Sequence, residues 1–242
     1  MSANIVEAVG LGVTFGGVHA LKNVDFRLAE GELRCLIGPN GAGKSTFFKL
    51  LTGQYSPTRG SVTIRGHSTR GLQSHQIAQL GVGIKTQVPS VFNGLSVEEN
   101  VWLSARRTAK GVAASKAVTD TLDMTGLGHL ATLQAGVLSH GQRQWVELAV
   151  VMASRPALVL LDEPAAGMSD EEVMRTAKLI GAINQRCALV VVEHDMEFIK
   201  MIARKVTVFN RGEVLLEDTV ERVLVDERVR DVYLGRELAM KG

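Results

Sequence analysis

The chain has 242 residues, of which 45% are hydrophobic and 21% are charged, and its formal net charge is +2. These values are typical of a globular protein with one large or two small domains, and the small net charge gives no reason to expect a nucleic-acid partner. No apolar run approaches the ~18 residues of a membrane span, and residues 1–4 do not open a signal peptide. We therefore expect a protein that is soluble, or that reaches a membrane only through a partner.

The two cysteines lie in or beside apolar stretches. Cys35 falls within a predicted strand, and Cys187 directly precedes another. We expect both to be buried free thiols, which favours a reducing compartment. No Cys/His spacing indicates a zinc site.

The first part of the chain, residues 4–37, alternates apolar and polar stretches separated by glycines. Residues 24–28 have the period-two pattern of a half-buried strand, and residues 61–65 indicate a second strand after a turn. We expect these strands to be antiparallel and to lie against a buried strand at residues 33–37.

A phosphate-binding loop follows that buried strand, with the sequence Gly38-Pro39-Asn40-Gly41-Ala42-Gly43-Lys44-Ser45-Thr46. Its glycines let backbone N–H groups turn toward phosphate oxygens, Lys44 would place its charge on the β- and γ-phosphates, and the Ser45 hydroxyl suits a Mg²⁺ ligand. Residues 45–51 have a helical pattern, and a helix N-terminus adds partial positive charge. This strand–loop–helix context disfavours the alternative, a glycine-rich turn that binds nothing.

The middle of the chain changes character. Helical patterns prevail from about residue 96 to residue 153, and apolar strands then return at residues 157–161, 188–192 and 206–209 with helices between them. Alternating strands and helices predict a parallel, sandwiched sheet. The expected fold class is therefore α/β, a single domain of residues 1–242 with a helical segment of about residues 88–153 inserted in its core.

Two acids, Asp162 and Glu163, end the strand predicted at residues 157–161. They would lie at the carboxyl edge of a parallel sheet, where ligands bind. Asp162 would hold the Mg²⁺ shell, and Glu163 would accept a proton from an attacking water. Neighbours in a strand point to opposite faces, so we expect the two acids to have different roles. Solvated acids at a strand end are the alternative.

A third signal is Leu138-Ser139-His140-Gly141-Gln142, which precedes a helical pattern through Ala153. Ser139 and Gln142 form a capping box, so Ser139 is predicted to be an N-cap. An exposed helix start can also present its N–H groups and hydroxyl to a second phosphate.

Taken in order, the phosphate loop, Gln87, residues 138–142, the two acids and His194 closely resemble the nucleotide-binding subunit of ATP-binding-cassette (ABC) transporters. The resemblance covers essentially the whole chain and implies a P-loop NTPase fold: an ABC-type ATPase core with an antiparallel β region and an inserted helical subdomain. It implies ATP and Mg²⁺ as cofactors. It also implies a head-to-tail dimer in which residues 138–142, here the signature segment, close over ATP held by the other subunit.

The family also implies roles for single residues. Ser139, Gly141 and Gln142 would contact the partner's nucleotide, and Gln87 would sense Mg²⁺ and water and link nucleotide state to the membrane partner. His194 would contact the γ-phosphate. Phe15 would stack on adenine, with core packing as the alternative.

Some positions depart from the family pattern or carry less signal. The usual middle glycine of the signature segment is His140, and Ser169 replaces a frequent aspartate, with Glu172 completing a second capping box. Trp102 and Trp145 are expected in the core. The sequence assigns no role to His19.

A narrower resemblance, to the branched-chain amino-acid uptake group and its urea/short-amide branch, rests on residues 15–21, 138–145, 163–168, 192–198 and 232–236. It implies an ATPase subunit of a bacterial-type importer, peripheral on the cytoplasmic face of the inner membrane. Its partners would be two transmembrane permease subunits, a second identical or paralogous ATP-binding subunit and, indirectly, an extracytoplasmic solute-binding protein.

Two rival functions remain open on the sequence. One is a soluble ABC protein that acts outside transport, although this chain has one phosphate loop and no sustained heptads in its helical region. The other is a P-loop kinase of small molecules, which needs no signature segment.

Overall fold

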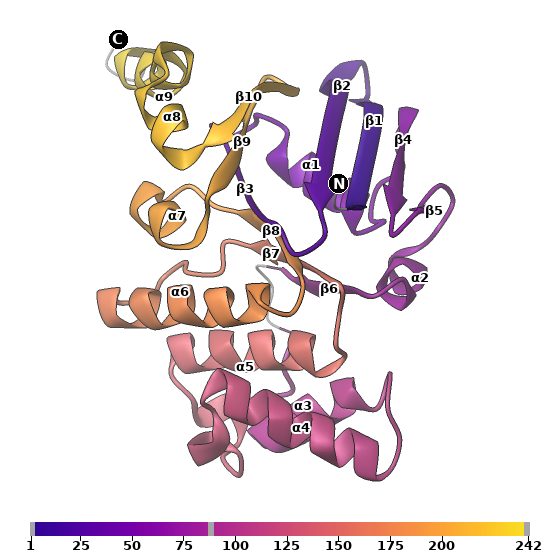
Figure 1. The fold of residues 1–242 in the computed structure, drawn as a ribbon. Coiled ribbons are helices and arrows are strands. Elements are labelled where there is room, and N and C mark those ends of the chain that lie inside the picture. Colours follow the sequence, from indigo (N-terminus) through magenta and orange to yellow (C-terminus); the bar gives the residue numbers. More distant parts are fainter. Residues whose placement is uncertain (1–2, 87–89, 240–242) are drawn as a thin grey trace.

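The computed structural model describes residues 3–86 and 90–239. Its centre is a six-stranded sheet in the order β10-β9-β3-β8-β7-β6, in which β10 is antiparallel to β9 and all other neighbours are parallel (Figure 1). β3 and β8 are buried at every position, as expected for strands covered on both faces. The strands span β3 Leu33–Ile37, β6 Val82–Lys85, β7 Leu158–Asp162, β8 Ala188–Val192, β9 Lys205–Asn210 and β10 Glu213–Thr219.

Alternate residues of this sheet enter two different apolar cores, because successive side chains of a strand point to opposite faces. In β3, Cys35 and Ile37 belong to the core shared with the helices that follow, whereas Leu36 belongs to the core shared with the N-terminal strands. Both cysteines are buried free thiols, as predicted.

The N-terminal strands form a second sheet of their own, in the order β2-β1-β4-β5, with every neighbouring pair antiparallel. Gly16 and Gly17 make the two-residue turn between its long strands, with φ of 51° and 86°, values that favour glycine. Its strands are β1 Asn4–Phe15, β2 Val18–Ala29, β4 Arg59–Ile64 and β5 His67–Ser68.

Helix α1 (Lys44–Leu51) joins the two sheets. Its Phe47, Phe48, Leu50 and Leu51 are buried in one apolar core with residues of both sheets. The antiparallel region predicted from the sequence is therefore present, but its strands form a sheet of their own, which does not pair with β3 and shares an apolar core with α1 and the parallel sheet.

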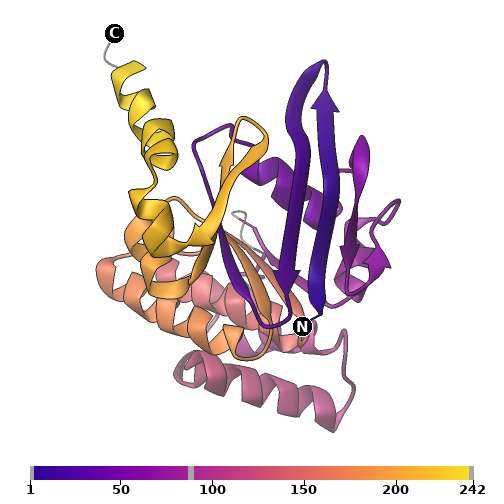
Figure 2. The ribbon, with the colours of Figure 1, turned by 45° about the horizontal axis from the view of Figure 1, so that its top comes forward.

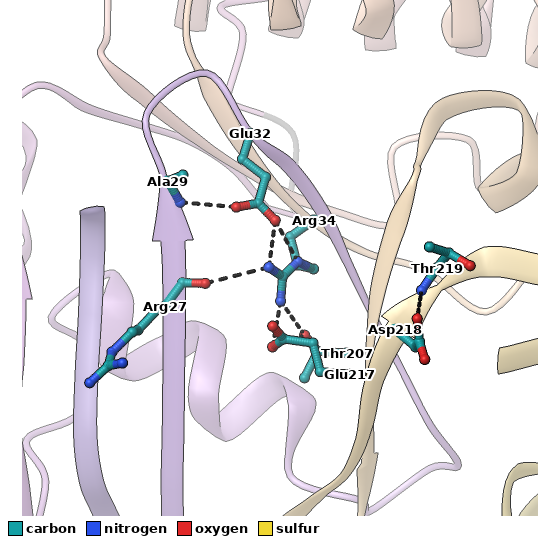
Figure 3. Close-up of polar contacts among 8 residues, drawn as sticks. All are labelled: Arg27, Ala29, Glu32, Arg34, Thr207, Glu217, Asp218 and Thr219. Carbon is teal, nitrogen blue, oxygen red and sulfur yellow. Dashed lines mark hydrogen bonds and ion pairs between the residues drawn. The ribbon is translucent and has the colours of Figure 1, made fainter. Parts of the chain in front are cut away.

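A buried arginine makes one direct polar link between the sheets (Figure 3). Arg34 of β3 forms ion pairs with Glu32 and with Glu217 of β10, and its Nη1 donates to Thr207 Oγ1 of β9 at 3.0 Å. Its Nη2 approaches the Arg27 carbonyl oxygen of β2 at 3.5 Å. One side chain thus ties four strands together.

The helices other than α1 lie mostly around the parallel sheet, away from the antiparallel one (Figures 1 and 2). Those between β6 and β7 pack on one another on the side away from the antiparallel sheet, whereas α8 and α9 follow β10 at the other end. In the described ranges, no helix is long and apolar enough to cross a membrane. The helices are α2 Ser74–Gln79, α3 Val97–Ala105, α4 Val112–Thr125, η1 Gly128–Leu130, η2 Ala135–Val137, α5 His140–Ala153, α6 Asp170–Asn184, α7 Met196–Ile202, α8 Val220–Val225 and α9 Glu227–Ala239.

The two tryptophans differ in environment. Trp145 of α5 is buried, as predicted, and its indole N–H donates to Thr176 Oγ1 at 2.8 Å. The core prediction for Trp102 is wrong: it lies on the outer side of α3, is exposed, and is covered in part by the Arg106 guanidinium.

Candidate active site

Three glycines with positive φ shape the loop between β3 and α1. Their φ angles are 141° at Gly38, 79° at Gly41 and 108° at Gly43. A Cβ added at Gly38 would lie 2.2 Å from the Phe209 carbonyl oxygen of β9, so no side chain fits there. The loop can therefore pass directly over the neighbouring strand and end at the first residue of α1.

This loop lines one side of a cavity of about 570 Å³. Both acids that end β7 line the same cavity, although they lie more than a hundred residues further along the chain. The cavity is lined by Val18, His19, Ala20, Lys22, Asn40, Gly41, Ala42, Gly43, Lys44, Ser45, Thr46, Asp162, Glu163, Val192, Arg211 and Gly212.

The ammonium group of Lys44 lies over its own loop. Its Nζ donates to the Gly38 carbonyl oxygen at 2.5 Å and to the Pro39 carbonyl oxygen at 3.1 Å. The α1 N-terminus behind it has no acidic residue in its first turn, so the positive end of the helix adds to the lysine charge.

The two acids reach the cavity in a way that strand alternation did not predict. Asp162 is the last residue of β7, but Glu163 has φ of 47°, and its N–H donates to the Val192 carbonyl oxygen at 3.0 Å. This left-handed residue ends the strand, so both carboxylates line one cavity instead of pointing to opposite faces. Burial raises the pKa of Asp162, as does the Glu163 charge, while Lys85, Lys44 and Lys49 act to lower it.

His194 stands beside Glu163, just after β8. Its Nδ1 lies 3.3 Å from Glu163 Oε1 and 3.9 Å from Glu193 Oε2. Glu193 is buried and accepts the His194 backbone N–H at 3.0 Å. Burial raises the pKa of Glu193, opposed by backbone N–H groups of His194, Asp195 and Ala165. The structure therefore brings His194 and the acid edge together.

The signature segment lies at the start of α5, away from the cavity lining. Ser139 caps the helix as predicted: its Oγ accepts the Gln142 N–H at 3.2 Å, and Gln142 Oε1 accepts the Ser139 N–H at 3.0 Å. A Cβ added at Gly141 would lie 2.1 Å from Glu172 Oε1, so Gly141 also has a packing role. The predicted capping box of Ser169 and Glu172 is present at α6.

Two predicted site residues, Phe15 and Gln87, are not among the described residues that line the cavity. Phe15 is 45% exposed at the end of β1, which contradicts core packing, and its ring lies 5.0 Å from that of Tyr55 in an edge-on arrangement. It does not line the cavity, but Val18, its partner across the hairpin, does. Gln87 lies outside the described residues.

Sequence reasoning missed one wall of the cavity. His19 and Lys22 come from β2, and Arg211 comes from the turn between β9 and β10. The Gly212 N–H of that turn donates to the Ala42 carbonyl oxygen at 2.9 Å, and the Lys22 N–H donates to the Gly212 carbonyl oxygen at 2.7 Å. The Asn-Arg-Gly sequence at residues 210–212 signals a tight turn, but not its contact with the phosphate loop.

The cavity can hold a polyphosphate with a divalent cation. Lys22, Lys44 and Arg211 supply positive charge, and the loop glycines expose backbone N–H groups. The Ser45 hydroxyl and the Asp162 carboxylate are the hard oxygen donors that Mg²⁺ prefers, and Mg²⁺ usually takes its remaining ligands from phosphates and water. The donor set therefore fits Mg²⁺ together with a nucleotide.

The comparisons with known proteins agree with this geometry. Residues 21–166 match the ABC transporter family. The chain is 35% identical to the high-affinity branched-chain amino acid transport ATP-binding protein LivG of Salmonella typhimurium, over 97% of this chain and 99% of LivG.

Two solved structures share the fold. An ATP-binding cassette of an ABC transporter in its ADP conformation has a TM-score of 0.86 at 23% identity and covers 97% of this chain and 100% of its own. A dimeric ATP-binding cassette in a post-hydrolysis state, bound to ADP and Pi, has a TM-score of 0.76 at 26% identity, over 89% of this chain and 98% of its own. The predicted fold class is confirmed.

Proposed function

The chain belongs to the ABC transporter family, whose ATP-binding subunits hydrolyse ATP, and from that premise we propose that it powers a solute importer. The imported solute would be a branched-chain or other amino acid, or urea or a short amide. The likeness to LivG over almost the whole chain supports an amino acid, and the motifs of residues 138–145 and 232–236 favour the urea/short-amide branch.

The observation that carries the proposal is that one cavity gathers the phosphate loop, a cationic wall and two acids. The backbone N–H groups from Asn40 to Thr46 would bind phosphate oxygens, with Gly38 giving the loop its path. Lys44 would exchange its two loop carbonyls for the β- and γ-phosphates. Adenine would lie toward the β1–β2 hairpin, where Phe15 and Tyr55 present exposed rings.

Ser45 and Asp162 would hold Mg²⁺, together with Gln87. When bound, the metal would neutralise charge on the phosphates. Glu163 would take the proton of the attacking water, since its carboxylate lines the cavity next to Asp162. His194 directs Nδ1 toward Glu163, which leaves Nε2 to contact the γ-phosphate.

A second ATP-binding subunit would complete the site. The signature segment lies away from the cavity of its own chain, so Ser139, Gly141 and Gln142 would contact a nucleotide held by a partner instead of their own. The dimeric cassette of similar fold supports this arrangement. We place the helical subdomain at about residues 88–153 within one nucleotide-binding domain of residues 1–242.

The membrane partners follow from the importer proposal. Two transmembrane permease subunits would carry the solute, and an extracytoplasmic solute-binding protein would deliver it to them. The chain would sit on the cytoplasmic face of the inner membrane as a peripheral subunit.

The Glu163→Gln variant tests the ATPase. The amide keeps the shape of the side chain but takes no proton, so hydrolysis should fall by about 10²–10⁴-fold while MgATP binding is retained. The bound state should sediment as a dimer, and adding Ser139→Arg should prevent that dimer. Hydrolysis at the parent rate, or an undiminished dimer in the double variant, would contradict the proposal.

The solute needs a separate experiment. Uptake of labelled amino acids, urea and short amides should be compared between a strain deleted for this chain, the same strain complemented with it, and the strain complemented with Lys44→Ala. The solute whose uptake returns only with the intact chain is the transported one. Unchanged uptake of the whole panel on deletion would refute the importer assignment.

A further inference from the structure

A buried ion pair lies where the helical segment meets the parallel sheet. Lys85 is the last residue of β6, the edge strand, and Glu147 lies in α5, which packs on β6. The Lys85 Nζ is 3.7 Å from Glu147 Oε2, and both side chains are 2% exposed. The pair therefore bridges the sheet and the helix that begins with the signature segment.

Stability alone does not account for this pair. Two charges taken out of water lose hydration that their attraction often fails to recover, and apolar residues of similar size are frequently as stable. Burial lowers the pKa of Lys85 and raises that of Glu147, each opposed by the charge of its partner. A backbone hydrogen bond from Ser90 also acts to lower the pKa of Glu147. The pair is better explained by the position in which it holds α5 against β6.

Glu147 continues a row of polar side chains on one face of α5. His140, Gln144 and Glu147 are spaced i, i+4 and i+7, which places them on the same side of a helix. His140 Nε2 lies 3.0 Å from the Ala166 carbonyl oxygen, in the loop after the two acids, and 3.5 Å from Gln144 Nε2. The face thus contacts the acid loop at one end and Lys85 at the other.

Lys85 also lies next to the acid edge itself. It pairs in parallel register with Leu161, the residue before Asp162. The negative charge of Asp162 acts on the lysine, as does that of Glu193. One ammonium group therefore stands between the acids of the cavity and the helix of the signature segment.

We propose that His140, Gln144, Glu147 and Lys85, here called the α5 polar row, are positioning residues that set the signature segment against the acid edge of the same chain. None of them lines the cavity. The α5 polar row acts by fixing the orientation of α5. Any effect of that orientation on closure of the dimer rests on the proposed function. The orientation of α5 in the single chain does not depend on the proposed function.

Two variants break the row at opposite ends. Lys85→Met with Glu147→Leu removes both members of the buried ion pair together, so neither is left buried without the other, and the fold should be retained. His140→Gly removes the contact with Ala166 at an exposed position. Lys116→Met is the matched control, because it removes a lysine from an exposed ion pair on α4 with Asp120.

The first readout is hydrogen exchange of residues 139–150 in the nucleotide-free chain, which needs no ATP chemistry. Both row variants should exchange faster there by about 2- to 30-fold, the range of measured coupling effects, while the control does not change. Unchanged exchange in the double variant would overturn the proposal. If that variant does not fold, unchanged exchange in His140→Gly overturns it instead.

The second readout separates positioning from general stability. In the Glu163→Gln background, His140→Gly, which leaves Lys85 and Asp162 intact, should keep the MgATP affinity of the single subunit within about twofold. The protein concentration at which half of this variant is dimeric should rise by about 2- to 30-fold. Dimerisation equal to that of the control would overturn the proposed effect on closure. If the background variant itself neither binds MgATP nor dimerises, the proposed function fails, and the exchange result alone decides the α5 polar row.

Discussion

Replacement of Arg34 by methionine should destabilise the fold strongly. Methionine has a similar length and stays apolar, but it leaves Glu32 and Glu217 without their shared cation and Thr207 without its donor (Figure 3). Because Arg34 is 1% exposed, no water can take its place without opening the contact between the two sheets.

The size of the loss can be worked from the exposure of the partners. Removing one member of a fully buried ion pair costs about 3–5 kcal/mol. The side chains of Glu32 and Glu217 are 19% and 36% exposed, so water recovers part of that loss. We expect a decrease of about 3 kcal/mol in the free energy of unfolding, a change of about 10²-fold in the equilibrium constant.

Urea unfolding of the nucleotide-free chain measures this decrease, with the slope of the transition unchanged. Arg27→Met is the control, because the Arg27 side chain is 70% exposed and its pair with Glu7 at 3.1 Å should contribute only about 0–1 kcal/mol. If Arg34→Met costs no more than Arg27→Met, the reasoning about the buried cation is wrong.

Four further outcomes are expected. Lys44→Ala should abolish tight ATP binding, because phosphate charge is left uncompensated; titration with a fluorescent nucleotide checks this, and hydrolysis at the parent rate would contradict it. Gly141→Ala should push the Glu172 side chain away from the N-terminus of α6, since the new Cβ would lie 2.1 Å from its Oε1. The free energy of unfolding, measured with urea, should fall by about 0.5–2 kcal/mol. Burial raises the pKa of Cys187 to about 11, so it should react slowly with a thiol reagent at about pH 8 until the chain is unfolded. Stability should also fall as pH rises from about 8.5 toward 11, because the unfolded thiol loses a proton that the folded one keeps; a flat urea midpoint across that range would argue against this.

Local signals were sufficient for much of the fold and part of the site. The phosphate loop is a contiguous motif whose glycine positions have a direct steric cause, as Gly38 shows. The capping boxes at Ser139 and Ser169 need only residues three apart. The order of apolar strands after residue 153 was sufficient to predict a parallel sheet.

The remainder depends on contacts between distant segments. Lys22 and Arg211 reach the cavity only because the β9–β10 turn is hydrogen-bonded to the phosphate loop, and no local pattern encodes that contact. The expectation that Asp162 and Glu163 point to opposite faces holds only if both residues lie in the strand. Glu163 has a left-handed backbone and lies just after the end of β7, so the expectation does not apply to it. The residue type of Trp102 predicts a core position, whereas the side chain is exposed on α3.

The order of the parallel sheet has a consequence for synthesis of the chain. β3, which carries the phosphate loop, is flanked by β8 and β9, and its Arg34 is bonded to Thr207, 173 residues further on. A ribosome therefore finishes the nucleotide loop early but releases its supporting strands last. Until residues 188–210 have emerged, β3 has no neighbour to pair with, and contacts this distant in sequence form slowly. We expect the nascent chain to acquire ATP affinity only near the end of translation, and to depend on chaperones until then.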